Sequence, residues 1–358
     1  MALIRFFLII LVCNGCGPYK DTEISIFEDD HKITSLYIPS NLWRGTEPMM
    51  ALKQIRVYRS GDTSNTEILG RLTYGGDDIG FSPVIPLAPG YEYTVVMGSD
   101  TLGSISIPLP PQSEAPRLTK ISPASDSLPA NLLKIYLHFS TPMQEGVSSE
   151  HISIKNEQGE LLKNVFLFLE QELWNKERTI LTLWLNPGRI KRDLQPNLSE
   201  GPPLEPSKRY TITISNKWRG ANGTFLEQSF SKKFYTREAD TASPDLTTWR
   251  IFSRSEGETF PLIIVPVEQI DMPLLEKSVE ILNDDEMPVS GILISNKTED
   301  FLYFYPTKPW KAGTHFISVQ STVEDLAGNN LDRLFDEDIS NKKPRAQSAR
   351  GLISFIVE

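Results

Sequence analysis

Histidines and clustered carboxylates are the side chains of this sequence that could bind a metal or transfer a proton. The four histidines are scattered, and no two of them have the spacing of metal ligands. The acidic clusters offer the oxygen atoms that calcium prefers, but none has the alternating Asp-x-Asp-x-Asp pattern of a calcium loop. Nucleophile-elbow, zinc-protease and phosphate-loop motifs are absent from the sequence as well. We therefore expect no catalytic residue, no metal site and no cofactor, and solvated loops at residues 28–30, 77–78, 284–286 and 336–338.

A group of three basic residues stands out in a chain that is otherwise acidic. Arg189, Lys191 and Arg192 lie within PGRIKRDLQPNLSEGP, residues 187–202, which we expect to project as a loop between two strands. A local basic patch can attract an acidic partner or an anionic polymer even when the whole protein is negative. Alternatively, the loop packs on a neighbouring domain, where Arg189 or Arg192 pairs with a carboxylate. The first interpretation makes the three residues a candidate partner-binding site, and the sequence leaves both open.

The N-terminal residues carry a separate signal, because both cysteines of the chain lie there. Arg5 precedes an apolar run over residues 6–12, which is too short to span a membrane and has the length of a signal-peptide core. The run ends in CNGC, where the small residue Gly15 directly precedes Cys16. This ending resembles the lipobox of bacterial lipoproteins, although Cys13 occupies the position that usually holds leucine.

The resemblance implies that residues 1–15 are a signal peptide and that Cys16 carries the lipid at the mature N-terminus. The mature chain would then have no free thiol for a disulfide, a metal site or nucleophilic catalysis. Gly17 follows the cysteine, and not the aspartate that retains enterobacterial lipoproteins in the inner membrane. The expected location is therefore the cell envelope, at the outer membrane of a Gram-negative cell. The alternatives are an ordinary signal peptide or a membrane-tethered apolar stub.

Length and composition describe an acidic globular protein of more than one domain. A chain of 358 residues is too long for one ordinary core and predicts two or three domains. The hydrophobic content of 39% and the charged content of 23% are close to globular averages. Because a chain with a net charge of −10 repels phosphate backbones, we expect no nucleic-acid partner.

Short runs that alternate between apolar and polar residues predict an all-β protein built from antiparallel sheets with one buried face. The run KIYLHF, residues 134–139, places Ile135, Leu137 and Phe139 on one side, and RYTITIS, residues 209–215, alternates in the same way. No helical periodicity is sustained over the length of a helix. The nearest case, PLLEKSVEIL at residues 273–282, is short and continues into β-branched residues.

One phrase recurs three times, roughly a domain length apart. FSPVIPLAPGYEYTVV at residues 81–96 is similar to FYPTKPWKAGTHFISV at residues 304–319, and a looser copy is split between residues 183–187 and 202–214. Each copy follows a Met–Pro or Pro–Met corner and a hairpin, so one repeat spans about a hundred residues, the size of an immunoglobulin-like sandwich. We therefore predict three tandem immunoglobulin-like antiparallel β-sandwiches, at residues 16–110, 111–240 and 241–358.

Parts of the second and third repeats resemble the bacterial SbsA-type immunoglobulin-like domain. The second repeat contains FSTPM, residues 139–143, which matches the Phe-Ser-x-Pro-Met pattern of that family. The third contains DLAGN, residues 325–329, which matches the family's Asp-x-Ala-Gly-Asn pattern. Each of these repeats lacks the other motif, and the first repeat keeps only the recurring phrase and a Pro–Met corner. The resemblance implies the fold and says almost nothing about activity.

Three classes of function fit these features. We favour a lipid-anchored cell-envelope protein whose immunoglobulin-like modules have a structural, spacer or protein-interaction role. A surface glycan-binding lipoprotein is the alternative, since Trp184 and Trp310 could line a sugar platform, although packing is the commoner role of such residues. An enzyme fits least, because no convergent set of catalytic residues can be named. The expected partners are the membrane, through a lipid on Cys16, and an envelope protein or glycan.

Overall fold

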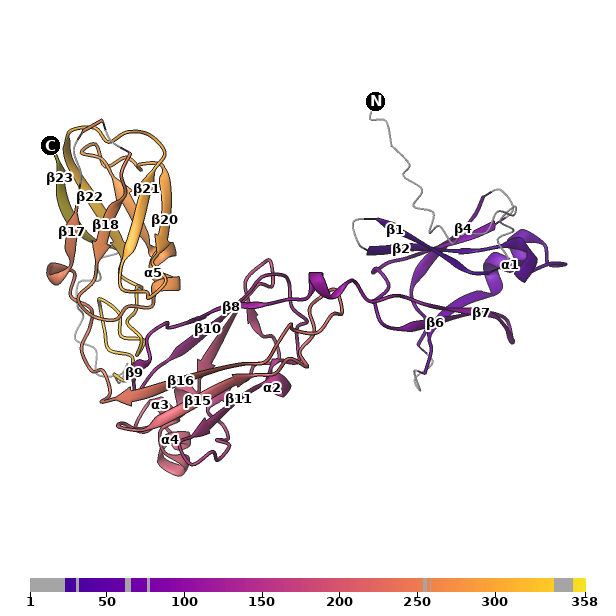
Figure 1. Ribbon diagram of the computed structural model, residues 1–358, viewed down its shortest axis with the longest axis horizontal. Helices are drawn as coiled ribbons and strands as arrows, with labels where there is room; N and C mark the ends of the chain where they lie inside the picture. The colour runs from indigo at the N-terminus through magenta and orange to yellow at the C-terminus, as the bar shows by residue number, and fades with distance from the viewer. Residues whose placement is uncertain are drawn as a thin grey trace. The chain divides into compact units, whose positions relative to one another are not determined.

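The computed structural model describes residues 23–29, 32–61, 66–75, 78–253, 256–257, 259–337 and 350–358. Strands in mainly antiparallel sheets dominate these residues, and the helices among them are short (Figure 1). The chain divides into two compact units, one ending at Pro110 and the other beginning at Pro111. The all-β class that the alternating runs predict is confirmed.

The first unit contains one β-sandwich. One sheet has the strand order β1–β2–β5–β4 and the other has the order β3–β6–β7. The helix α1, Pro48–Gln54, joins β2 to β3, and its cap residue Glu47 accepts a hydrogen bond from the backbone N–H of Met50. The strands are β1 (Ser25–Asp29), β2 (Lys32–Ile38), β3 (Ile55–Arg59), β4 (Gly70–Gly75), β5 (Asp78–Pro83), β6 (Glu92–Met97) and β7 (Asp100–Ser106).

The second sandwich opens the second unit. Its sheets have the orders β12–β14–β10–β8, with β13 also on β14, and β11–β15–β16–β9. The helix α2, Ser148–His151, precedes β11. The strands are β8 (Leu118–Ser122), β9 (Ser127–Pro129), β10 (Lys134–Phe139), β11 (Ile152–Asn156), β12 (Phe166–Leu167), β13 (Leu173–Trp174), β14 (Ile180–Leu185), β15 (Arg209–Ile214) and β16 (Phe230–Arg237).

The third sandwich has the sheets β17–β18–β21–β20 and β19–β22–β23. Its helix α5, Met272–Ser278, runs directly into β19, so the segment 273–282 divides between a helix and a strand. The strands are β17 (Arg250–Phe252), β18 (Leu262–Val265), β19 (Val279–Leu282), β20 (Gly291–Ser295), β21 (Leu302–Pro306), β22 (Gly313–Gln320) and β23 (Arg350–Val357).

The three sandwiches share one strand order, and it is that of an immunoglobulin domain. When the main strands of each are lettered A to G along the chain, A, B, E and D form one sheet and C, F and G form the other. The second sandwich adds β9 to its CFG sheet, in parallel with β16. We call the two layers of each sandwich the ABED sheet and the CFG sheet. The predicted tandem immunoglobulin-like fold is thereby confirmed.

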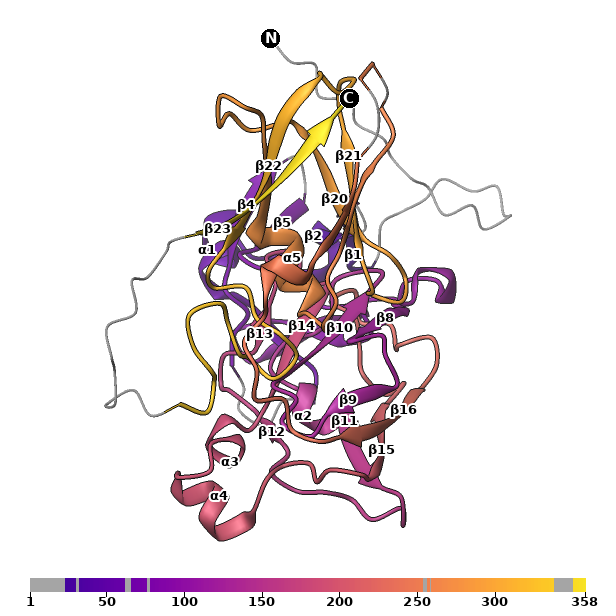
Figure 2. The same ribbon diagram turned by 90° about the vertical axis from the view of Figure 1, so that its left-hand side faces the viewer.

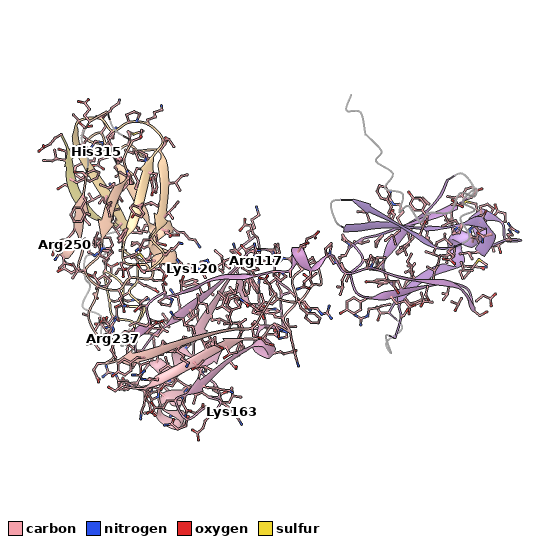
Figure 3. The ribbon with its side chains drawn as sticks, in the orientation of Figure 1. Arg117, Lys120, Lys163, Arg237, Arg250 and His315 are labelled. Carbon is pink, nitrogen blue, oxygen red and sulfur yellow. The ribbon has the colours of Figure 1, made fainter. Side chains whose placement is uncertain are left out.

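The recurring phrase builds the corner that leads into strand F. In the first two sandwiches a tyrosine near the start of that strand, Tyr93 or Tyr210, accepts a hydrogen bond from the backbone N–H five residues upstream, at 2.9 Å in both. This is the tyrosine corner of immunoglobulin-like domains. The third sandwich instead has His315 on β22, which Figure 3 labels, and the His315 ring contacts the rings of Trp310 and Phe355. The repeated sequence therefore specifies a turn and its packing.

Each sandwich buries the apolar side of its alternating strands in a hydrophobic core of its own. On β10 the core-facing side chains are Ile135, Leu137 and Phe139, as predicted, while Tyr136 and His138 face outward. Burial of one such apolar side chain contributes roughly 1.5–3 kcal/mol. The alternation thus fixes which side of the strand is buried and leaves the outward side free for contacts with other parts of the chain.

Candidate functional site

Polar and charged side chains gather where the third sandwich meets the second, inside the unit that begins at Pro111. The third sandwich contributes α5, the turn between β20 and β21, and the segment that follows β22. The second contributes the outward side of β8 and β10 in its ABED sheet. We call this contact the joint. Of the predicted site residues, Cys16 lies outside the described residues, and the three basic residues are placed as set out below.

Asp271 is the centre of the joint. It is 4% exposed, and its Oδ2 accepts a hydrogen bond from the hydroxyl of Tyr136 at 2.6 Å. The Nζ of Lys134 lies 3.5 Å from the same oxygen and 2.5 Å from Oε2 of Glu324. Because Asp271 is also the cap residue of α5, where it accepts from the N–H of Leu274, one carboxylate both starts the helix and binds the second sandwich.

Burial sets the electrostatics of this cluster. It raises the pKa of the Asp271 carboxyl, while the ammonium of Lys134 and the hydroxyl of Tyr136 act in the opposite direction. Burial, together with the neighbouring Asp271 carboxylate, also raises the pKa of the Tyr136 phenol, so Tyr136 stays a hydrogen-bond donor at physiological pH. Lys134 is therefore held between two carboxylates of the third sandwich.

Glu299 makes a second buried contact at the joint. It lies in the turn between β20 and β21, with its side chain 6% exposed. Its carboxylate accepts from the hydroxyl of Ser122 and from the backbone N–H of Ala124, and it lies 2.6 Å from Nζ of Lys120. The Nε2 of His138 is 3.2 Å from the Ser122 hydroxyl, and burial with the nearby Lys120 charge lowers the pKa of His138. A neutral His138 is compatible with the positive charge beside it.

The linker between the two sandwiches is held from both sides. The carbonyl of Asp240 accepts from the side-chain amides of Asn131 in the second sandwich and Asn329 in the third, at 2.8 and 3.2 Å. Asn329 also donates to Asp325, whose carboxyl accepts from the backbone N–H of Ala327 as well. Burial raises the pKa of Asp325 to about 7, against these donors, which act to lower it. The DLAGN segment therefore joins the third sandwich to the linker.

The joint encloses little space for a ligand. A cavity of about 10 Å³, close to the volume that one water needs, lies among Tyr136, Asp271, Glu299 and Glu324. The buried carboxylates there have cationic or hydrogen-bonding partners from the other sandwich. Desolvation offsets much of the attraction between buried charges, but a buried charge that loses its partner is costly, so both sandwiches must keep these groups in register. The chemistry of the joint is thus suited to fixing two modules against each other.

Arg189 lies inside the second sandwich and not on its surface. The residue is 8% exposed and belongs to the short helix α3, Pro187–Ile190. Its guanidinium uses all of its donor directions on backbone carbonyls, at distances of 2.8–3.1 Å. The accepting carbonyls are those of Lys163, Asn164, Glu200, Gly201 and Pro202. Arg189 therefore holds residues 187–202, which we call the basic insert, to the rest of the sandwich.

Lys191 and Arg192 face the third sandwich. The Nζ of Lys191 lies 4.8 Å from the centre of the Phe335 ring, a cation–π distance. The Nε of Arg192 is 2.6 Å from Oδ2 of Asp336, and its backbone N–H donates to Oδ1 of the same residue. These contacts agree with the interpretation in which the insert packs on a neighbouring domain and Arg192 pairs with a carboxylate there. Capture of a partner by the basic residues stays a prediction, and Arg189 has no exposed charge to offer it.

The basic insert is more regular than the loop that the sequence predicts. It forms α3 and then α4, Gln195–Glu200, which lie together in both views (Figure 2). Pro187 and Pro196 each occupy one of the first helical positions, and the side chain of Asn186 caps α3. Proline is favoured there because its missing N–H would have no partner in the helix. Prolines that suggest a loop in the sequence are helix starts in the structure.

The two tryptophans considered for a sugar platform have other neighbours. Trp310 is 4% exposed, lies in the core of the third sandwich, and donates from Nε1 to the carbonyl of Phe260. Trp184 is half-buried on β14, and the ammonium of Lys134 lies 5.9 Å from its ring. Neither residue forms an open aromatic surface.

Among the described residues, no three His, Cys, Asp or Glu side chains come close enough together to hold a metal ion. No helix within those ranges has both the length and the apolar character needed to cross a bilayer.

No family model and no curated protein matches the chain. Solved structures that are similar to it include domains MG0-NIE-MG1 of Escherichia coli alpha-2-macroglobulin, with 12% identity, 68% of this chain and 72% of that one covered, and a TM-score of 0.23. The N-terminal part of the bacterial S-layer protein SbsC has 11% identity, covers 69% of this chain and 45% of that one, and gives a TM-score of 0.24. Domains FN1-FN3 of chicken CNTN1 have 13% identity, with 93% of this chain and 97% of that one covered, and a TM-score of 0.22.

Similarities this weak carry no argument about function. The immunoglobulin-like assignment rests on the strand order of each sandwich, which is complete without them. The finer resemblances, to SbsA-type domains and to lipoproteins, stay predictions.

The residues of the joint were missed in the sequence, with one partial exception. Asp271 directly precedes Met-Pro, and an acidic residue followed by proline is a recognised start of a helix. That signal marks α5 but not the partner of Asp271, because Tyr136 is 135 residues away in the chain. Glu299 and Asp240 have no local pattern that sets them apart from other surface carboxylates.

Proposed function

We propose that this protein is a lipid-anchored component of the cell envelope whose tandem immunoglobulin-like modules act as a spacer and a protein-interaction scaffold. The observation that carries the proposal is the joint, where Asp271 and Glu299 of one module are buried against specific donors of the next. Because the two modules are held in one arrangement, a binding surface on one module keeps a fixed position relative to the other module. That property suits a spacer or a scaffold better than a catalyst.

The anchor is inferred from the CNGC ending and is consistent with where the first sandwich begins. Ser25 of β1 pairs with Tyr37 near the end of β2, so the described chain starts at the end of the sandwich that carries α1. The residues from Cys16 to Glu23 can span at most about 25 Å. A lipid on Cys16 would therefore keep the α1 end of this sandwich close to the bilayer.

Metabolic labelling with an alkyne fatty acid tests the anchor directly. The wild-type chain and a Cys13→Ser variant should both be labelled, and Cys16→Ser should lose the label, because Cys16 alone is acylated. Separation of inner and outer membranes should then place the labelled protein in the outer-membrane fraction. Equal labelling of the Cys16→Ser variant would show that the lipid is attached to another residue and would contradict the assignment of Cys16 as the anchor.

A further inference from the structure

The outward side of the ABED sheet in the third sandwich is apolar across all four strands. Phe252 of β17 pairs with Ile263 of β18, Ile263 with Tyr303 of β21, and Tyr303 with Ile294 of β20. Tyr305 and Ile292 form a second pair on the same side. We call these six residues the apolar sheet face, and Figure 1 shows its four strands side by side.

Much of this face is open to solvent. Four of its side chains are roughly half exposed, namely Phe252 at 54%, Ile292 at 59%, Ile294 at 48% and Tyr305 at 43%. At about half of ~200 Å² each, they present on the order of 400 Å². A contiguous apolar patch of that size is as large as the largest on a typical monomer, and such patches are often functional.

The fold itself does not demand an apolar surface here. In the second sandwich the corresponding side of the ABED sheet carries Lys120, Tyr136 and His138, and the third sandwich covers part of it. In the first sandwich this side carries Ser35 and Ser82, whose hydroxyls lie 3.0 Å apart, and one large exposed apolar side chain on β2, that of Tyr37. An antiparallel sheet with one solvated face is normally polar on that face. The third sandwich departs from this pattern in the way expected of a covered surface.

We propose that the apolar sheet face is the interface with a second copy of this chain. With its two partly buried members, Ile263 and Tyr303, the face presents about 500 Å², so two copies would bury about 1,000 Å², the size of a weak or transient complex. Homodimer interfaces are the most apolar class, and they favour aromatic residues and exclude charge from the centre. The six residues include three aromatic side chains and no charged one.

A twofold axis that lies midway between the two faces, parallel to both sheets and across their strands, satisfies the remaining geometry. Two such faces pack about 10 Å apart with their strands within roughly 30° of each other, as sheets do inside a sandwich. On the described strands of this sheet, Arg250 is the outward residue that carries a charge, and it lies at the end of β17 where it pairs with Val265. The twofold axis places the two Arg250 side chains at opposite ends of the interface, so they do not repel each other.

Sedimentation of the chain from Gly17 to Glu358 tests the proposal, because that chain contains every described residue and neither cysteine. The wild type should pass from monomer to dimer below about 100 µM, a modest affinity that this area allows. The double change Ile292→Lys and Ile294→Lys should raise the dissociation constant at least about thirtyfold, because it places charge at the centre of the interface. Both side chains are exposed in the single chain, so its thermal unfolding should not change.

The matched control is Ile356→Lys. Ile356 is 62% exposed on β23, in the CFG sheet of the same sandwich, and the change should leave the dimer intact. A wild-type chain that stays monomeric up to that concentration overturns the proposal. An equal loss of association in the Ile356→Lys control also overturns it, because it would show nonspecific hydrophobic association and not a dimer formed through the apolar sheet face.

Discussion

The joint and the basic insert both bind the third sandwich to the second, and they differ in burial more than in chemistry. At the joint the carboxylates of Asp271 and Glu299 are almost fully enclosed. At the insert Arg192 makes an equally short pair with Asp336, yet its side chain is 76% exposed. Water screens an exposed pair, whereas a buried charge that loses its partner is costly. The presence of charge alone therefore does not identify the residues that fix the two modules.

The largest effect is expected for Asp271→Ala. The change leaves Lys134 with one carboxylate, removes the acceptor of the Tyr136 hydroxyl and takes the cap from α5. The free energy of unfolding should fall by about 3 kcal/mol, measured by urea denaturation. Asp285→Ala, in an exposed turn of the same sandwich, is the control and should change it by no more than about 0.5 kcal/mol. Equal losses in the two variants would contradict the role given to the joint.

The basic insert provides a second comparison between a buried and an exposed arginine. Arg189→Ala should lower the free energy of unfolding by about 2 kcal/mol, because five backbone carbonyls lose a charged donor. Lysine should not rescue this position, since one ammonium cannot replace a planar fork of donors. Arg192→Ala should leave thermal unfolding unchanged. If Arg192→Ala lowers the free energy of unfolding as much as Arg189→Ala does, burial does not explain the difference expected between the two arginines.

A smaller effect is expected in the pH dependence of stability through Asp325. Its pKa is about 7 in the folded protein and about 3.9 in an unfolded chain, so the folded state retains a proton that the unfolded state loses. Stability should therefore fall as the pH rises from about 4 to about 7 and level off above that.

Asp325→Asn isolates this contribution, because the amide oxygen can still accept from Ala327 and Asn329. The melting temperature of the wild type relative to the variant should decrease between pH 4.5 and pH 7.5, the range chosen to bracket the titration. Asp271 is present in both proteins, so its contribution to the pH dependence cancels when the two melting temperatures are subtracted. A difference that is constant over this range would exclude the raised pKa.

The sequence predicts what depends on neighbouring residues and misses what depends on distant ones. The alternation of KIYLHF identifies both the strand β10 and its buried side chains, because a strand repeats every two residues. The sequence shows Arg189 as part of a cluster of basic residues. It does not predict that Arg189 is buried, because the carbonyls that accept its hydrogen bonds come from two separate segments. The pairing of Tyr136 with Asp271 depends on how two folded modules meet, and no local spacing encodes that contact.

The parallel pairing of β9 with β16 has a mechanical consequence. These strands lie near the two ends of the second sandwich, and hydrogen bonds such as those from Tyr235 to Asp126 and from Ala130 to Arg237 flank their pairing. When tension pulls the ends of the module apart, parallel strands slide past each other and their hydrogen bonds carry the load together. Antiparallel strands joined at one end would instead open bond by bond. The second sandwich is therefore built to resist stretching along the chain.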